Sequence, residues 1–334
     1  MPIYSTAEQV LELGIPDPEL TAILKEVPYL ATVRQRYGVE DVDELRQQVA
    51  AVRPSFCPPD EDVEEFELQS PARDGYMIPM RCYRLKTPPQ EGCALIINFH
   101  GGGFFSGDLQ SDADFCRSRV KDNKAVVVDV DYRLSPEHPF PVPTNDCWDA
   151  VLWISKNFET LQANPSLGFL VSGVSAGASI ASVMSLLARD NELSPPLTGT
   201  FLSALPAALT VDVVPEKHRH LWLSRKQNAQ APIFNEPIYS KSFLASPMVH
   251  PKGNSGLPRT YFLVCGMDPL RDGALIYETI LREESGVETA MDVFPGLPHC
   301  WWSIFPQLSA TSDYHLRVGK AFDWLLRKTD EISD

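Results

Sequence analysis

The sequence predicts an α/β protein whose central sheet is mostly parallel and flanked by helices. From residue 94 onward, short apolar runs typical of buried strands alternate with amphipathic runs typical of helices. Such alternation is typical of parallel strands joined by crossover helices, which cover both faces of the sheet. The chain has 334 residues, of which 44% are hydrophobic, and this is enough to fill a large core around such a sheet.

The N-terminal part is predicted to be helical from about Asp17 to Arg53. Asp17 is a candidate N-cap, Pro18 suits the first helical turn, and apolar residues recur every three to four positions after residue 42. A proline-rich stretch then ends the helical pattern. The strand-like runs that follow are residues 63–68, 77–83, 94–99 and 125–130.

The second half continues the alternation. The pattern predicts helices at 145–157 and 176–189, strands at 168–172, 200–204, 261–265 and 290–294, and helices that end near Leu326. Residues 205–256 depart from it and are too long for an ordinary connection, so we expect an inserted cap. The predicted parts are an N-terminal cap region (1–55), a first core part (56–204), the cap insert (205–256) and a second core part (257–334).

Composition and charge restrict the possible partners. The formal net charge is -15 and no dense cluster of Lys and Arg is visible, so we expect no nucleic-acid partner. The seven cysteines are odd in number and lack C-x-x-C spacing, which predicts buried hydrophobic residues rather than zinc ligands or disulfides. No signal peptide or integral membrane segment is recognisable. We expect a cytoplasmic protein, either a monomer or a homodimer.

The stretch "GVSAG" places Ser175 between an apolar strand and an amphipathic helix. This G-x-S-x-G pattern at a strand-to-helix turn is typical of a nucleophilic serine. Gly173 and Gly177 would remove the Cβ atoms that otherwise collide where the strand and the helix approach each other. The sequence therefore predicts Ser175 as a nucleophile.

A nucleophilic serine needs a base and an acid, which follow it here in the chain order Ser, acid, His. His299 comes after a strand and a Pro-Gly-rich turn, whereas the other downstream histidines lie in the irregular insert or in a helical pattern. Asp268 follows an apolar strand, and Asp272 is expected in the first turn of the next helix. We predict Asp268 and His299 as acid and base. A helix-capping carboxylate and a solvated loop histidine are the alternatives.

The stretch "NFHGGGFFSG" supplies candidate donors for a negatively charged oxygen. Consecutive glycines after a strand let backbone N–H groups turn inward, and the start of the helix after Ser175 offers another N–H. The expected oxyanion hole is Gly102, Gly103 and Ala176. A phosphate-binding loop is the alternative, but no G-K-[ST] follows.

Five segments together resemble the hormone-sensitive-lipase-like group of α/β-hydrolase esterases. They are "HGGGFFSGD", "DVDYRLSPEHPFP", "GVSAGA", "DPLRDGA" and "GLPHCWW", which span at least residues 94–301. The resemblance implies an α/β-hydrolase fold with a helical cap made from the N-terminus and the insert. It assigns the nucleophile, acid, base and oxyanion donors to the residues chosen above, and it implies that His100 orders the glycine loop.

The resemblance also implies supporting residues and shows two departures. Tyr132, Arg133, Glu137 and His138 are expected to brace the site from behind. Many members have an acidic residue before the serine and glycines at the positions of Ala178 and Cys300, whereas Val174 stands before Ser175 here. These departures should alter local electrostatics and substrate preference without removing an atom that acyl transfer needs.

The sequence therefore predicts a serine carboxylic-ester hydrolase that requires no metal or organic cofactor. Its partner is expected to be a small-molecule ester with a short to medium acyl group, including acetylated or lactone-bearing metabolites. The candidate substrate-binding residues are Phe104, Phe105, Val174, Trp222 and Trp301, although each aromatic residue among them could equally be part of the core. A small-molecule receptor on a hydrolase scaffold and a lyase or acyltransferase with the same serine are the alternatives.

Overall fold

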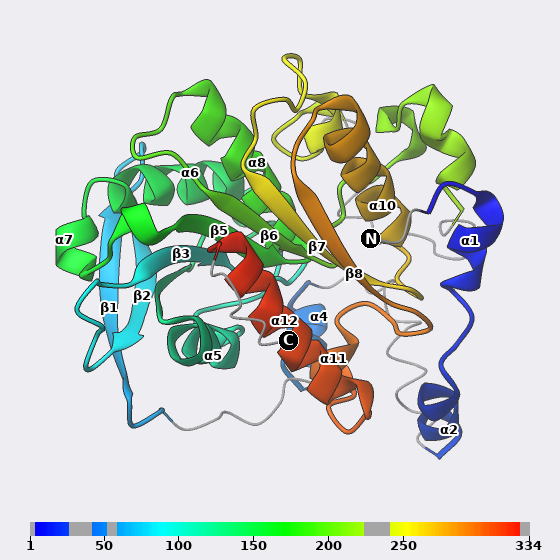
Figure 1. The fold of residues 1–334 in the computed structure, drawn as a ribbon, viewed down its shortest axis with the longest axis horizontal. Coiled ribbons are helices and arrows are strands. Elements are labelled where there is room, and N and C mark those ends of the chain that lie inside the picture. Colours follow the sequence, from blue (N-terminus) through cyan, green and yellow to red (C-terminus); the bar gives the residue numbers. More distant parts are fainter. Residues whose placement is uncertain (1–3, 27–41, 52–58, 224–240, 328–334) are drawn as a thin grey trace, which may run out of the picture.

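An eight-stranded sheet forms the centre of the molecule (Figure 1). The computed structural model describes residues 4–26, 42–51, 59–223 and 241–327. The strands lie in the order β1-β2-β4-β3-β5-β6-β7-β8. They are β1 (Val63–Pro71), β2 (Met77–Leu85), β3 (Ala94–Phe99), β4 (Ala125–Val130), β5 (Phe169–Val174), β6 (Gly199–Ser203), β7 (Arg259–Cys265) and β8 (Thr289–Phe294).

The sheet is mostly parallel, as the alternation of elements predicted. β1 and β2 form an antiparallel pair at one edge, and β2 is also antiparallel to β4. All pairs from β4 through β3, β5, β6 and β7 to β8 are parallel. The carboxyl ends of these parallel strands therefore lie along one edge of the sheet, where an open α/β sheet presents its ligand-facing residues.

Helices cover both faces of the sheet, and each face has its own hydrophobic core. α6 (Val142–Ile154), α8 (Ala176–Asp190) and α10 (Arg271–Thr279) contribute to one core, and α5 (Ala113–Asn123) and α12 (Ala310–Leu325) to the other. Figure 1 shows α5 and α12 on one side of the sheet and α6, α8 and α10 on the other. The central strands β3 and β4 are buried along their whole length because both of their faces are covered.

Helix α5 was not predicted from the sequence, because charged side chains occupy its buried positions. Arg117 pairs with Glu65 on β1, and Arg119 lies with its guanidinium over the rings of Phe115 and Phe322. The two arginines are only 6% and 1% exposed. An apolar stripe is therefore missing from the sequence of this helix, although its inner face is packed.

The remaining helices among the described residues are short. They are α1 (Ala7–Glu12), α2 (Pro18–Glu26), α4 (Val42–Ala51), α7 (Phe158–Leu161), α11 (Trp301–Ile304), the 3-10 helices η1 (Pro165–Leu167), η2 (Val211–Val213), η3 (Glu216–Leu221) and η6 (Pro247–Val249), and the π-helical turn η7 (Ile280–Glu284). Asp17 caps α2 as predicted, since its carboxylate accepts the backbone N–H groups of Glu19 and Leu20.

The part of the predicted insert that the structure describes is irregular apart from η2, η3, η6 and one further helical residue. Phe234 and Tyr239, two aromatic residues of the insert, lie outside the described residues.

The cysteines behave largely as predicted. Those at 82, 93, 116, 147 and 265 are buried, Cys300 is half-buried, and none of these six forms a disulfide. Cys57 lies outside the described residues. Within the described ranges, no helix is long and apolar enough to cross a membrane.

Candidate active site

Ser175 lies at a sharp turn between β5 and α8. Its backbone has φ 55° and ψ -118°, outside the regions that residues with a side chain favour, and α8 begins at the next residue. The Ser175 N–H donates to the Ser203 carbonyl of the neighbouring strand at 2.9 Å. The turn thus presents the Ser175 hydroxyl at the carboxyl edge of the sheet, as the G-x-S-x-G pattern predicts.

The two flanking glycines allow the helix to pass close to the strands. A Cβ atom on Gly173 would lie 2.3 Å from the Gly177 carbonyl, and a Cβ on Gly177 would lie 1.8 Å from the Phe99 carbonyl oxygen. Both distances are far inside van der Waals contact with backbone atoms. The expected reason for glycine at these positions is therefore correct.

Ser175, His299 and Asp268 form one hydrogen-bonded chain. The His299 Nε2 atom lies 2.8 Å from the Ser175 Oγ, and the His299 Nδ1 atom lies 2.5 Å from the Asp268 Oδ2. Because a carboxylate only accepts hydrogen bonds, Nδ1 donates to Asp268, and Nε2 of the neutral ring is left to accept from the serine hydroxyl. The structure thus brings together the three residues that the sequence predicted, each from a different loop after a parallel strand.

The surroundings of His299 raise the pKa of its imidazole. Burial lowers the pKa of the imidazole, but the adjacent Asp268 carboxylate and the Cys300 side chain raise it, and the net shift of the pKa is well upward. This electrostatic effect is what an orienting carboxylate supplies to a base that must become an imidazolium.

Asp268 is fixed at the end of β7. Its side chain is almost completely buried, and its second oxygen, Oδ1, accepts the Leu270 N–H at 2.8 Å. Asp272 lies in the first turn of α10, as expected, where it pairs with Arg271 and accepts the Leu223 N–H at 2.6 Å. Asp272, the other carboxylate considered for the acid, therefore links α10 to the insert.

The loop that carries His299 is paired with the N-terminal segment. The Gly296 N–H donates to the Leu13 carbonyl at 2.9 Å, and the Asp17 N–H donates to the Gly296 carbonyl at 3.0 Å. A Cβ on Gly296 would lie 2.5 Å from the Asp17 nitrogen. Only glycine therefore lets the N-terminal segment lie this close to the His299 loop.

The glycine loop after β3 is tightly turned. Gly102 has φ 120° and Gly103 has φ 63°, and the Gly102 carbonyl accepts hydrogen bonds from the N–H and the side-chain hydroxyl of Ser106. A Cβ on Gly102 would lie 1.9 Å from the Ser106 carbonyl oxygen. A Cβ on Gly101 would lie 3.0 Å from the Val174 carbonyl, so the loop lies directly against the turn of Ser175.

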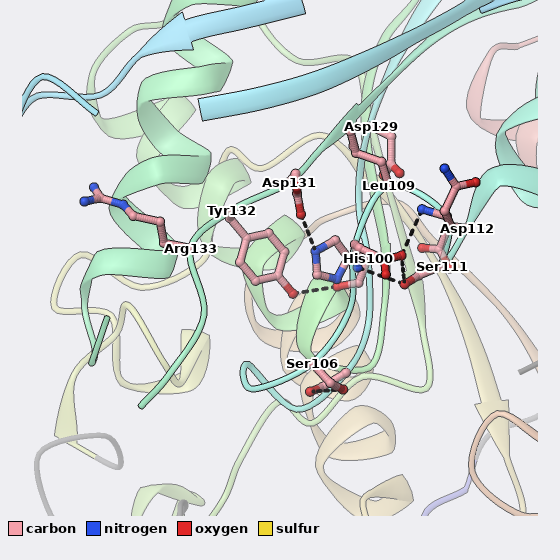
Figure 2. A network of polar contacts seen from close by, with 12 residues as sticks. His100, Ser106, Leu109, Ser111, Asp112, Asp129, Asp131, Tyr132 and Arg133 are labelled. Atoms are coloured by element: carbon pink, nitrogen blue, oxygen red, sulfur yellow. Dashed lines mark hydrogen bonds and ion pairs between the residues drawn. The ribbon is translucent and has the colours of Figure 1, made fainter. Parts of the chain in front are cut away.

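A polar network supports the glycine loop from behind (Figure 2). The Tyr132 hydroxyl donates to the His100 carbonyl at 2.7 Å, and the Tyr132 and His100 rings stack with centroids 4.3 Å apart. Asp131 approaches the same imidazole, with its Oδ1 3.9 Å from Nε2. Burial, together with Asp108, raises the pKa of Asp131 to about 6. His100 and Tyr132 therefore lie where the resemblance implied.

The network continues into the sheet through the buried Asp129 and the half-buried Asp112, two carboxylates that the sequence did not single out. The Asn98 amide donates to Asp129 at 2.8 Å and to Asp112 at 3.0 Å, and its oxygen accepts from Ser172. Burial and the nearby Asp112 raise the pKa of Asp129 well above its ordinary value. Asp129 lies inside an apolar strand, so a single carboxylate within a run of valines was the only sequence signal.

Arg133 and Glu137, two of the expected brace residues, form ion pairs away from the side chains of Ser175, Asp268 and His299. Arg133 forms a two-pronged pair with Asp146 and a further ion pair with Asp74. Glu137 pairs with Arg46 of α4 through both carboxylate oxygens.

The candidate substrate-binding residues divide into two groups. Phe104, Val174 and Trp222 are half-buried. Phe105 is 5% exposed and Trp301 is fully buried, where it packs against Phe294 and Tyr314. The expected pocket-wall role is therefore wrong for Trp301, whose ring fills the core between β8 and α12. The ring of Phe105 packs against the backbone of Gly103.

No group of three or more His, Cys, Asp or Glu side chains within the described ranges could hold a metal ion.

Comparisons with known proteins agree with the fold and with the motifs. A family model of the α/β-hydrolase fold matches residues 96–303. An α/β-hydrolase superfamily protein of Schizosaccharomyces pombe is 33% identical over 332 residues, covering 95% of this chain and 96% of that protein. A versiconal hemiacetal acetate esterase of Dothistroma septosporum is 30% identical over 299 residues, covering 85% and 88%. The solved structure of a bacterial heroin esterase is 27% identical, has a TM-score of 0.79, and the match covers 94% of this chain and 98% of that one.

The fold and these matches define an enzyme, an α/β hydrolase of the carboxylesterase type. More narrowly, the chain belongs to the hormone-sensitive-lipase-like family of α/β hydrolases, in agreement with the resemblance of its motifs.

Proposed function

We propose that the protein hydrolyses carboxylic esters of small molecules through Ser175, His299 and Asp268. The hydrogen-bonded chain of these three side chains carries the proposal. Ser175 Oγ attacks the ester carbonyl while His299 Nε2 takes its proton, and Asp268 stabilises the imidazolium. His299 then returns the proton to the leaving alcohol. Water releases the acyl group by the same steps.

We propose Gly102, Gly103 and Ala176 as the donors to the tetrahedral oxyanion. Ala176 is the first residue of α8, and the N–H groups of a first helical turn have no partner within the helix. The glycine loop lies against the turn of Ser175, as the Gly101 contact with Val174 indicates. Backbone donors fixed beside the nucleophile stabilise charge that develops only in the transition state.

The proposed substrates are esters with short to medium acyl groups, acetates first among them. The name of the relative from Dothistroma septosporum, an acetate esterase, supports this choice. Phe104 and Trp222 are half-buried aromatic residues and remain the proposed wall of the substrate site, together with Val174. A series of p-nitrophenyl esters from acetate to decanoate, with lactones included, tests the acyl preference.

We also propose that residues 1–55 and 205–256 form a cap over this site. The pairing of Gly296 with Leu13 and Asp17, and the bond from Leu223 to Asp272, support contact of the first segment with the loop after β8 and of the second with the start of α10. Exchange of residues 205–256 for the corresponding segment of a relative should change the acyl preference and leave the pH profile unchanged.

The first test is the variant Ser175→Ala. It should lower kcat on p-nitrophenyl acetate by about 10⁵-fold or more, because the nucleophile is lost, and it should no longer be labelled by a fluorophosphonate probe. Ser166→Ala, an exposed serine of η1, is the matched control and should keep full activity and labelling. Full hydrolysis by Ser175→Ala would refute the proposed function.

Two outcomes would support the other functions predicted from the sequence. A protein that binds a small molecule tightly but does not react with the fluorophosphonate would be a receptor on this scaffold. A protein that forms a new ester when an acceptor alcohol is added, or an elimination product without water uptake, would be an acyltransferase or a lyase.

A further inference from the structure

Arg46 reaches from the N-terminal helix α4 to the loops behind the proposed oxyanion hole. Its Nε atom donates to the Phe105 carbonyl at 2.7 Å, and its Nη2 donates to the Ser135 carbonyl at 3.1 Å. Phe105 belongs to the glycine loop and lies 59 positions away in the chain. One side chain of α4 therefore binds the main chain of two loops that border the proposed active site.

All five N–H groups of this guanidinium have acceptors. Besides the two carbonyls, Nη1 and Nη2 donate to the two carboxylate oxygens of Glu137 at 2.8 and 2.7 Å, and Nη1 donates to Asp43 at 3.3 Å. Five is the full donor capacity of an arginine, and lysine could not reproduce the planar fork. The hydrogen bond and charge of Arg46 lower the pKa of Glu137 to about 2, so this pair stays ionised through the neutral range.

The two loops that Arg46 bridges are also bonded to each other. The Ser135 N–H donates to the Phe104 carbonyl at 2.8 Å, so the glycine loop and the segment after β4 share a main-chain hydrogen bond. Next to this bond, Arg46 binds the carbonyl of Ser135 in one segment and the carbonyl of Phe105 in the other. Without Arg46, the Ser135–Phe104 bond and the Tyr132 hydroxyl on the His100 carbonyl would still join these segments, but the Phe105 carbonyl would lose its partner from α4.

We propose that Arg46 is a positioning residue for the oxyanion hole, which holds the glycine loop in its reactive geometry through the Phe105 and Ser135 carbonyls. The proposal rests on the proposed function, because it assumes that Gly102 and Gly103 donate to the oxyanion. Glu137 orients the guanidinium, which gives a role to this member of the brace. Docking of α4 is thereby coupled to turnover, since the same side chain joins the helix to the loop.

The test compares kcat and KM of Arg46→Ala with those of the wild type on p-nitrophenyl acetate. Because misplacement of a reacting group by about 1 Å costs up to about 100-fold, kcat should fall by about 10-fold to 100-fold, while KM changes by less than about threefold. Arg46→Lys should lie near Arg46→Ala, because an ammonium lacks the fork. Ethylguanidinium added at millimolar concentration should restore part of kcat in Arg46→Ala but have no effect on Arg46→Lys.

The matched control is Arg84→Ala. Arg84 is another partly buried arginine, paired with Glu64 across β1 and β2 at the far edge of the sheet (Figure 1). This variant should keep the wild-type kcat. A comparable loss of kcat in Arg84→Ala would mean that loss of any such ion pair weakens the enzyme, and it would overturn the positioning role.

Thermal melting separates a folding defect from a positioning defect. If Arg46→Ala does not fold, Glu137→Ala provides the test, because this carboxylate is half exposed. It should fold and lower kcat by about twofold to fivefold, the range expected for loss of an exposed pair. The proposal would be overturned if the variant that folds had the kcat of the wild type, or if the substitution changed only KM.

Fluorophosphonate labelling distinguishes failure of this proposal from failure of the proposed function. If the wild type is labelled at Ser175 and Arg46→Ala is labelled at the same rate and retains kcat, only the role of Arg46 is refuted. If the wild type is not labelled at Ser175, the proposed function itself is refuted, and the role of Arg46 with it.

Discussion

The turn of Ser175 and the glycine loop lie against each other but are positioned in different ways. Ser175 is fixed between β5 and α8, and the glycines that permit the turn are its neighbours in the sequence. The glycine loop depends on partners far away in the chain, Tyr132 at 32 positions from His100 and Arg46 at 59 positions from Phe105.

This difference indicates that the two halves of the proposed active site have different tolerances. The strand-to-helix turn belongs to the sheet itself, so damage there should unfold the protein. The glycine loop is attached to the sheet by side-chain hydrogen bonds, so damage there should lower turnover and leave the fold intact. Three substitutions test this distinction and a fourth tests the proposed acid Asp268, in order from the largest expected effect to the smallest.

Gly177→Val should abolish folding. Its Cβ would lie 1.8 Å from the Phe99 carbonyl oxygen, and a backbone atom inside the central strand β3 cannot move aside. Soluble yield and circular dichroism measure the effect. In Gly319→Ala, a control within α12, the Cβ would meet only Arg119 at 3.9 Å, and the change should stabilise the protein by up to about 1 kcal/mol. A folded Gly177→Val variant would contradict the rigid turn.

Asp268→Asn should lower kcat by about 10³-fold to 10⁴-fold with a small effect on folding. Asp268 raises the pKa of His299, and the base must be neutral to act, so activity is lost as the pH falls through that pKa. Removal of the carboxylate lowers the pKa and should move the acidic limb of the kcat/KM profile to lower pH.

The control for the acid is Asp272→Asn in the first turn of α10. This variant should leave the acidic limb where it is in the wild type, because Asp272 binds Arg271 and Leu223 rather than the imidazole. If the acidic limb moved to the same extent in both variants, the net charge near the site, rather than the contact of Asp268 with His299, would determine the pH profile.

Gly103→Ala should lower kcat by about 10-fold to 100-fold, since small displacements of oxyanion donors are costly. The added Cβ would lie 2.5 Å from the Phe105 ring, at a residue with φ 63°. The left-handed backbone costs a residue with a side chain only about 1–2 kcal/mol, so the melting temperature should fall by a few degrees. Parallel loss of activity and stability would place this loop in the same class as the Ser175 turn.

Tyr132→Phe should have the smallest effect, a fall in kcat of about twofold to fivefold, as expected for one neutral hydrogen bond. The variant removes the bond to the His100 carbonyl but keeps the stacked ring. Tyr277→Phe is the control, because this equally buried tyrosine donates to Asn254 away from the glycine loop. Equal kcat losses in both variants would remove the special role of Tyr132.

Much of the fold could be predicted from the sequence because the parallel strands are short and apolar. The predicted runs at 94–99 and 125–130 match β3 and β4, and the other predicted strands differ by a few residues at their ends. Helix α5 could not be predicted, because the partners that let Arg117 and Arg119 lie inside, Glu65 and Phe322, belong to distant elements. The burial of Trp301 was equally invisible, since it depends on Tyr314 and Phe294.

The sequence by itself determined the sheet, the strand-to-helix turn and the order of Ser175, Asp268 and His299. These features depend on local patterns, namely apolar runs, glycines beside a strained residue and polar residues at strand ends, and nearby residues are enough to read them. Only the tertiary structure decided that Arg46 binds the glycine loop and that Tyr132 does so through the His100 carbonyl, because hydrogen bonds between distant side chains and backbone carbonyls leave no periodicity in the chain.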